Sequence, residues 1–131
     1  MKTEVLQVKN LTKSFANGTQ RSEILKGVSF SVFDGEYVSI SGPSGCGKST
    51  LLNIMGLLDT CDTGEYFIDG LRVSDLDANQ RASIRSRRIG FVFQAFNLID
   101  EYTVIDNVAL PLKYRGDSRS KRRARALECI E

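Results

Sequence analysis

The sequence predicts an α/β fold, with strands and a helix at its centre and further helices towards the C-terminus. Before the centre, apolar and polar residues alternate with the period of strands, as Val28, Phe30 and Val32 do. The glycine-rich stretch GPSGCGKST then separates an apolar, β-like run, Tyr37–Ser41, from a run with leucines at helical spacing. The last third of the chain is polar, basic and helix-like.

Composition limits the classes of function. The chain has 131 residues, which fits one domain, and 41% of them are hydrophobic, enough to bury a core. Its net charge of +2 is too small to indicate a nucleic-acid partner. It has no histidine, which excludes His-based acid–base chemistry and His metal sites from this segment. The three cysteines, Cys46, Cys61 and Cys129, are odd in number and include no pair with metal-ligand spacing. Together with the lack of a signal-peptide pattern, this favours a reduced, cytosolic setting.

The first elements follow from alternation and turn signals. Asn17-Gly18 is the strongest turn signal before the centre, and Asp34-Gly35 is the next. We expect a strand over 5–15, a loop over 16–23, a strand over 24–33, a turn at Asp34-Gly35 and a further strand over 37–41.

The later elements depend on helical spacing and on capping residues. Asp69-Gly70 marks a hairpin turn, and Thr103 can cap a helix that Pro111 should kink or end. We expect a helix over 49–59, a hairpin over 64–73, a helix over 75–88, a strand over 89–94 that is buried on both faces, a helix over 104–114 and a basic helix over 118–131.

The central stretch matches the pattern G-x-x-x-x-G-K-[ST] at every fixed position, between a β-like run and a helical run. Glycines let the backbone wrap closely, so that successive N–H groups face an anion and the helix N-terminus adds positive potential. Lys48 would reach the β- and γ-phosphates, Ser49 would ligate Mg²⁺, and Thr50 would donate near the α-phosphate. The predicted binding residues are Gly42, Pro43, Ser44, Gly45, Cys46, Gly47, Lys48, Ser49 and Thr50.

Two simpler interpretations apply to this stretch. It could be a glycine-rich turn between strand and helix that holds no ligand. Cys46 is best interpreted as a small residue that fills the loop, although its alkylation should still block nucleotide binding by steric hindrance.

The whole chain resembles the N-terminal half of the nucleotide-binding domain of ABC transporters. The resemblance rests on LQVKNLTKSF, ILKGVSFSVFDGEYVSISGPSGCGKSTLLNIMGLLD, TGEYFIDG and RRIGFVFQAFNLI followed by YTVIDNVALPL. The last of these is similar to the lipoprotein-releasing and macrolide-efflux exporter branch. The resemblance implies a P-loop NTPase fold, a RecA-like core plus an antiparallel β subdomain. Residues 1–95 would form this part, and residues 96–131 would carry the Q-loop and the start of the helical subdomain.

The resemblance assigns roles to two residues outside the loop. Phe15 matches the aromatic position that stacks on adenine, although it could instead be a core phenylalanine near a strand end. Gln94 matches the Q-loop glutamine, which implies contact with Mg²⁺ or the attacking water; taken alone, it would be a solvated loop residue. Lys48 and Gln94 are therefore the predicted catalytic residues, and Ser49 and Gln94 the predicted metal ligands.

Other features are better explained without chemistry. Gly64, Asp69 and Gly70 should serve hairpin geometry, and YFIDG is not a Walker B strand because a turn glycine follows its aspartate. Two basic clusters are best explained as solvated helix faces; docking to a membrane subunit or to anionic lipid is the functional alternative. The clusters are Arg81, Arg85, Arg87 and Arg88, and Arg115, Arg119, Lys121, Arg122, Arg123 and Arg125.

The family's remaining catalytic parts do not occur in the sequence: it has no apolar run ending in Asp-Glu, no SGG and no histidine. We therefore expect this chain to be a fragment of a longer polypeptide that binds nucleotide weakly and hydrolyses ATP negligibly by itself. The same absence should leave the segment Tyr37–Ser41 without neighbouring strands, as an open edge.

The resemblance implies ATP and Mg²⁺ as cofactors, and transmembrane permease subunits and a second nucleotide-binding domain as partners. Nucleic acid is not expected. The protein would lie on the cytoplasmic face of the membrane, and the direction of transport would be export. No apolar run in the sequence approaches the roughly 20 residues that are needed to cross a bilayer. The alternatives are a soluble ABC-type ATPase acting on DNA or ribosomes, a truncated non-catalytic nucleotide-binding module and, least favoured, a small-molecule kinase.

Overall fold

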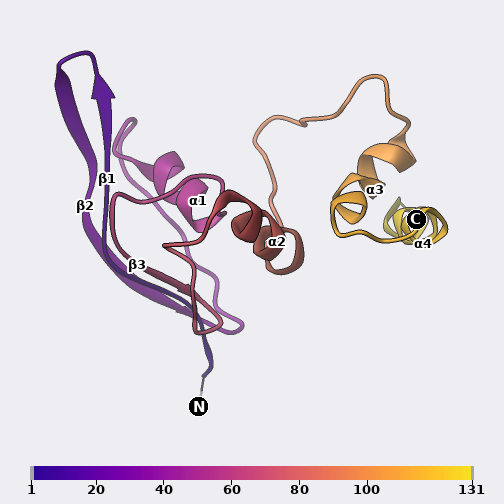
Figure 1. Cartoon of the computed structure of the whole chain (residues 1–131), viewed down its shortest axis with the longest axis horizontal. Helices are drawn as coiled ribbons and strands as arrows, with labels where there is room; N and C mark the ends of the chain where they lie inside the picture. The colour runs from indigo at the N-terminus through magenta and orange to yellow at the C-terminus, as the bar shows by residue number, and fades with distance from the viewer. Residues whose placement is uncertain (1, 131) are drawn as a thin grey trace. The chain divides into compact units, whose positions relative to one another are not determined.

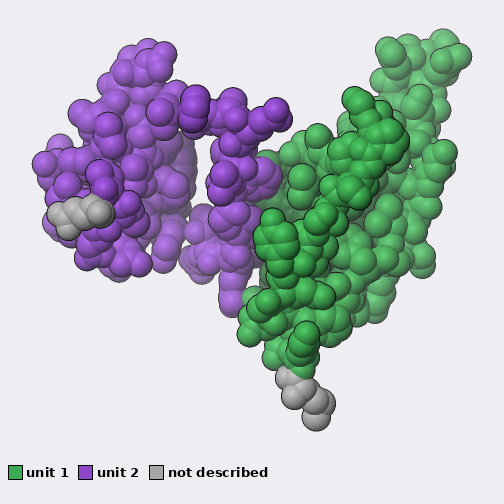
Figure 2. All heavy atoms as spheres, turned by 180° about the vertical axis from the view of Figure 1, so that it is seen from behind, with its two compact units in different colours: residues 1–81 green, residues 82–131 purple. Residues whose placement is uncertain are grey.

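The computed structural model describes residues 2–130 and divides the chain into two compact units, residues 1–81 and residues 82–131 (Figure 2). The first unit holds a sheet of order β2-β1-β3-β4 and the helix α1; the second holds α3 and α4. The helix α2 (Ala78–Arg88) contains the boundary between the units.

A long antiparallel hairpin forms one side of the sheet (Figure 1). The strand β1 (Glu4–Asn17) pairs with β2 (Gln20–Phe33) from Glu4 opposite Phe33 to Asn17 opposite Gln20. Both predicted strands are confirmed, but the loop expected over 16–23 is wrong. Only Gly18 and Thr19 connect the strands, because Gly18 adopts a φ of 64° and a tight turn lets the ladder continue to the tip.

A second hairpin extends the sheet on the other side of β1. The strands β3 (Thr63–Ile68) and β4 (Leu71–Arg72) flank a turn in which Asp69 has a φ of 49° and Gly70 a φ of 76°. Two successive positive φ values are typical of the type I′ turn, so this predicted hairpin is confirmed. Gly64 lets β3 approach β1 closely, since a Cβ there would lie 2.6 Å from the Asn10 carbonyl oxygen.

The helix α1 (Lys48–Met55) packs its apolar face in the core of the first unit. It ends at Met55 with Gly56 as its C-cap, earlier than the expected residue 59, and Leu57 then takes a positive φ. The buried hydrophobic residues of this unit come from both hairpins and from α1 and its exit; they are Val8, Leu11, Leu25, Leu51, Ile54, Leu57, Tyr66 and Val73. This core joins the sheet to the helix that follows the glycine-rich loop.

Two segments predicted as strands lie outside the hydrogen-bonded sheet. Neither Tyr37–Ser41 nor residues 89–94 pair with a strand among residues 2–130. The prediction that 89–94 is buried on both faces is wrong, because Val92 is 98% exposed. An apolar run forms a strand only where a neighbour completes its hydrogen bonds, and the exposure of Tyr37, at 96%, agrees with the expected open edge.

The three remaining helices agree with the predicted ones. Asp77 and Gln80 form a reciprocal capping box at the start of α2. Thr103 caps α3 (Val104–Tyr114) by accepting from the Asp106 N–H. Of the two outcomes expected at Pro111, an end or a kink, the structure excludes the end, because α3 runs on to Tyr114. The helix gives up the one backbone hydrogen bond that proline cannot donate.

In the second unit α3 packs against α4 (Arg119–Ile130), where Ala126 is buried. Among residues 2–130, the helices are all too short or too polar to traverse a bilayer.

Candidate nucleotide-binding site

The glycine-rich loop places its special backbone angles where the motif has glycine. Gly45 has a φ of 78° and Gly47 a φ of 100°, in the region that glycine adopts without a Cβ clash. A Cβ on Gly42 would lie 2.7 Å from the Cys46 Sγ, so the Cys46 side chain covers Gly42. This contact agrees with the interpretation of Cys46 as a filler residue. The residues of the loop from Gly42 to Cys46 are exposed and open to a ligand.

Gly47 anchors the end of the loop to the sheet. A Cβ at this position would lie 2.8 Å from the Ile24 Cγ2 and 3.1 Å from the Leu25 Cδ2. These side chains belong to β2, so the backbone of Gly47 packs directly against that strand. The start of α1 is thereby fixed in position beside the first hairpin.

Lys48, the first residue of α1, folds back over the loop. Its Nζ donates to the Gly42 carbonyl oxygen at 2.8 Å and to the Pro43 carbonyl oxygen at 2.6 Å. An ammonium group has three N–H donors, and the third faces the Cys46 Sγ at 3.7 Å, so the positive charge is held at the mouth of the loop. A phosphate oxygen is a better acceptor than a thiol sulfur and would replace it.

The N-terminus of α1 offers backbone N–H groups to an anion. Its N-cap residue is Gly47, which has no side chain to accept from these groups, and the first turn contains no acidic residue. Ser49 is exposed and Thr50 is half-buried at the same end of the helix. The uncapped donors, the helix dipole and Lys48 together favour a polyanion at this position.

Phe15 lies near the tip of the first hairpin, and the residue is 45% exposed. The Lys13 Nζ lies over the ring, 5.3 Å from its centroid. An exposed aromatic face is what stacking on a base needs. The structure therefore places the residue predicted for adenine on the strand β1, whose partner β2 also contacts Gly47.

Lys13 was not predicted from the sequence. Only 9% of this residue is exposed, and its Nζ donates to the Asp59 Oδ1 at 3.0 Å and to the Thr60 carbonyl oxygen at 2.5 Å. The sequence did contain one signal for it. Side chains along a β-strand alternate between its two faces, so Lys13 lies on the same face of β1 as the buried Leu11. A charge on an apolar face needs a partner, and Asp59 provides it.

Besides the contacts of Lys13 with Asp59 and Thr60, a second contact joins β1 to the segment after α1: Asp62 binds Ser14, the residue next to Phe15. Its Oδ2 accepts from the Ser14 N–H at 2.8 Å and from the Arg21 NH2 at 3.1 Å. The hydrogen bond from Ser14, with a smaller contribution from Arg21, holds the pKa of the Asp62 carboxyl below its ordinary value.

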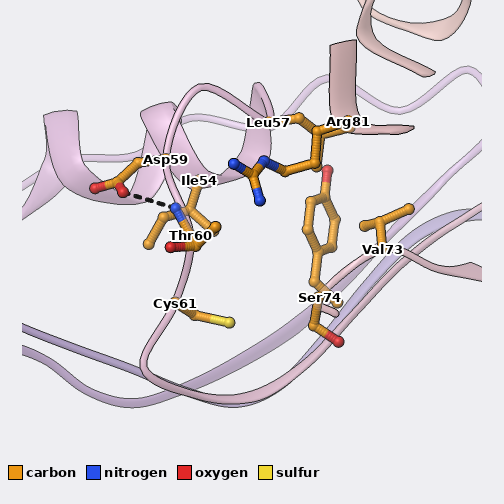
Figure 3. A pocket seen from close by; sticks show the side chains of 9 residues that line it. Ile54, Leu57, Asp59, Thr60, Cys61, Val73, Ser74 and Arg81 are labelled. Atoms are coloured by element: carbon orange, nitrogen blue, oxygen red, sulfur yellow. Dashed lines mark hydrogen bonds between the residues drawn. The ribbon is translucent and has the colours of Figure 1, made fainter. Parts of the chain in front are cut away.

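The exit of α1 contains a pocket that is too small for a ligand (Figure 3). Its cavity volume is about 10 Å³, which is room for roughly one water molecule. Burial raises the pKa of the Cys61 thiol beside it. The lining residues Ile54, Leu57, Asp59, Thr60, Cys61, Tyr66, Val73, Ser74 and Arg81 join α1 to the sheet. This pocket is a packing junction.

Gln94 is exposed and belongs to the second unit, whereas the loop and Phe15 belong to the first. Phe15 and the phosphate loop therefore belong to the same unit, and Gln94 belongs to the other. Among the described residues, no group of three or more Cys, Asp or Glu side chains could hold a metal ion.

The basic clusters are partly neutralised within their own segments. Lys121 pairs with Asp117 at 3.5 Å, and Arg125 pairs with Glu128 at 2.7 Å. In the first unit Arg81 donates to the Leu76 carbonyl oxygen at 2.8 Å. Such local pairs are typical of solvated helix faces.

A glycine-rich loop that leads into an uncapped helix, with a lysine at the helix start, defines a phosphate-loop nucleotide-binding protein. The family model for ABC transporters matches residues 25–131 of this chain. The chain therefore belongs to the ABC transporter family, and its fold is part of an ATP-binding cassette.

Individual relatives agree with this assignment. An ABC transporter ATP-binding protein of Methanocaldococcus jannaschii is 49% identical over 130 residues, which cover 97% of this chain and 55% of that protein. The macrolide export ATP-binding/permease protein MacB of Mannheimia succiniciproducens is 42% identical over 127 residues, which cover 97% of this chain and 20% of that protein. The chain thus spans about half of the first relative and a fifth of the second.

A solved structure gives the same result. It is a dimeric, post-hydrolysis state of an ATP-binding cassette bound to ADP and Pi. It is 47% identical to this chain with a TM-score of 0.87, and the match covers 95% of this chain and 55% of that one.

Proposed function

We propose that this chain is the ATP-binding segment of an ABC transporter ATPase subunit. In the whole protein, ATP binding and hydrolysis would be coupled to the export of a substrate across a membrane. The observation that carries the proposal is the phosphate loop: Gly47 is fixed against β2, the N-terminus of α1 has no side-chain cap, and Lys48 lies at the mouth of the loop. These features favour a bound polyphosphate.

Each predicted site residue has a role in this proposal. Backbone N–H groups between Gly42 and Gly47 surround the β-phosphate, Lys48 neutralises the β- and γ-phosphates, and Thr50 donates near the α-phosphate. Phe15 stacks on adenine with its exposed face. The roles of Phe15 and of the loop together favour ATP over inorganic polyphosphate.

Magnesium fits the donors that the loop offers. Mg²⁺ keeps several waters and takes phosphate oxygens, so one or two protein oxygens are enough to bind it. The exposed Ser49 hydroxyl would supply one, and Gln94, from outside the loop, is the proposed second ligand through its amide oxygen. When bound, the ion would neutralise charge that develops on the phosphates. Gln94 would also orient the water that attacks the γ-phosphate.

The partners follow from family membership. The relatives include an ATP-binding/permease protein and dimeric cassettes, which supports a second nucleotide-binding domain and transmembrane permease subunits as partners. The subunit would then lie on the cytoplasmic face of the membrane. Residues 1–95 would form the core and β subdomain, and residues 96–131 the Q-loop and the start of the helical subdomain. The similarity to a macrolide export protein favours export.

Lys48→Ala tests the function in the full-length protein. Loss of a charge-assisted contact of about 1.5–3 kcal/mol should weaken MgATP binding roughly 10- to 150-fold, as measured by isothermal titration calorimetry, and should abolish phosphate release. Lys113→Ala, which removes an exposed lysine from α3, is the matched control and should leave both unchanged. Equal MgATP affinity in Lys48→Ala and the wild type would contradict the proposal.

A further inference from the structure

We propose that Lys13 is a positioning residue, which holds the Phe15 ring at a set place relative to the phosphate loop and so determines the affinity for the base of the nucleotide. Asp62 contributes to the same positioning through its hydrogen bond with the backbone N–H of Ser14, the residue between Lys13 and Phe15. The inference rests on the proposed function, because it assumes that Phe15 stacks on the base.

The segment that follows α1 holds both residues that precede Phe15. Lys13 donates through its Nζ to the Asp59 Oδ1 at 3.0 Å and to the Thr60 carbonyl oxygen at 2.5 Å. Ser14 donates through its backbone N–H to the Asp62 Oδ2 at 2.8 Å. The two residues directly before Phe15 are therefore both hydrogen-bonded to this segment, Lys13 through its side chain and Ser14 through its backbone.

The helix α1 connects this segment to the phosphate loop. Its start is fixed where Gly47 packs on Ile24 and Leu25 of β2, and its end is fixed where the Tyr66 hydroxyl donates to the Met55 carbonyl oxygen at 2.7 Å. A helix anchored at both ends is a rigid spacer. It carries the loop at one end and the residues that hold Lys13 and Ser14 just beyond the other.

The hairpin provides a second connection between the same two points. In the register of β1 and β2, Lys13 lies opposite Leu25, and Leu25 contacts the position of Gly47. The loop and the ring are thus joined once through the helix and once through the strand pair. A closed frame of this kind fixes a separation more firmly than a single flexible connection does.

The ammonium group also restricts the ring itself. The Lys13 Nζ lies over the Phe15 ring at 5.3 Å from its centroid, and the residue remains 45% exposed. A cation over one face of a ring attracts its π system and limits its rotation. The opposite face is then the one on which a flat base would stack.

Tripolyphosphate separates positioning of the base site from support of the fold, because it occupies the phosphate loop and has no base. In the full-length protein, Lys13→Met should weaken MgATP binding about five- to tenfold, in line with a partly desolvated cation–π contact and lost ordering. Its affinity for tripolyphosphate should stay within about twofold of the wild-type value, since the loop keeps its own contacts. Calorimetry measures both affinities.

Lys9→Met is the matched control, since Lys9 lies on the same strand with its Nζ 5.2 Å from the centroid of Phe67. It should change neither affinity. Asp62→Asn is a second, milder variant; it leaves Lys13 in place and should weaken MgATP in the same selective way. In a Phe15→Ala background, Lys13→Met should cause no further loss of MgATP affinity.

Equal losses of MgATP and tripolyphosphate in Lys13→Met would overturn the inference, and so would an undiminished effect in the Phe15→Ala background. A wild-type protein that binds neither ligand would instead refute the proposed function itself. A wild type that binds MgATP no more tightly than tripolyphosphate, with Phe15→Ala unchanged, would refute base stacking and the positioning role, and would leave the phosphate loop intact.

Discussion

The Tyr66 hydroxyl donates a 2.7 Å hydrogen bond to the carbonyl oxygen of Met55, the last residue of α1. Tyr66 is 2% exposed, and burial raises the pKa of its hydroxyl, so the group is a neutral donor at every physiological pH. One side chain from β3 thus satisfies a carbonyl group that the end of the helix leaves unpaired. The bond fixes the helix that carries the phosphate loop.

Tyr66→Phe should lower the free energy of unfolding by about 0.5–1.5 kcal/mol, because the part-buried Met55 carbonyl group would lose its hydrogen-bond donor. Urea denaturation of the full-length protein measures this. Tyr114→Phe is the matched control, since Tyr114 is 77% exposed, and it should change stability by less than about 0.5 kcal/mol. Equal stability of Tyr66→Phe and the wild type would show that water or a backbone shift replaces the bond.

Gly47→Ala should distort the phosphate loop and lower its affinity for MgATP, while the rest of the fold should change less. The new Cβ would lie 2.8 Å from the Ile24 Cγ2 at a φ of 100°, so strain of about 1–3 kcal/mol would be added at the start of α1. We expect MgATP affinity to fall at least about fivefold by calorimetry. Gly90→Ala, where a Cβ would meet nothing within 4 Å, should leave the affinity unaltered. Unimpaired binding by Gly47→Ala would show that this contact does not shape the site.

Local patterns predicted the parts of the fold that local chemistry determines. The turn at Asp69-Gly70 needs positive φ at both residues, and the cap at Thr103 needs only a hydroxyl near a helix start, so both could be predicted. The phosphate loop belongs to the same class, because its glycines and Lys48 are adjacent in sequence.

Contacts between distant segments could not be predicted in this way. The loop expected over 16–23 is part of a ladder, and ladder length depends on the partner strand. The apolar run at 89–94 was expected to be buried, yet burial needs a neighbouring strand that the described residues do not supply. Lys13 was missed for the same reason: Asp59 and Thr60, its partners, lie more than forty residues away.

Cys46 should react with an alkylating reagent unless nucleotide covers it. Its side chain is exposed in the phosphate loop, next to Gly42. In a variant with Cys61→Ser and Cys129→Ser, the labelling rate measured by mass spectrometry should fall at least about tenfold at ATP concentrations well above Kd, because the bound fraction then exceeds about nine-tenths. Tripolyphosphate should protect in the same way, whereas adenosine should not. Labelling that is indifferent to ATP would show that the nucleotide does not occupy this loop.

Asp62 should make stability depend on pH in the acid range. Its pKa is lower in the folded chain than the ordinary value of 3.8, mainly because the Ser14 N–H donates to the ionised form. A carboxyl group with a lowered folded pKa contributes its full stabilisation above the unfolded pKa and loses it as the pH falls through the folded pKa. Asp62→Asn should therefore be less stable than the wild type at pH 7, and the difference in melting temperature should shrink steadily below pH 4. Glu23→Gln, which changes an exposed carboxylate on β2, is the control for general charge effects. A gap between Asp62→Asn and the wild type that stays constant from pH 7 to pH 2 would rule out ionisation of Asp62 as its source.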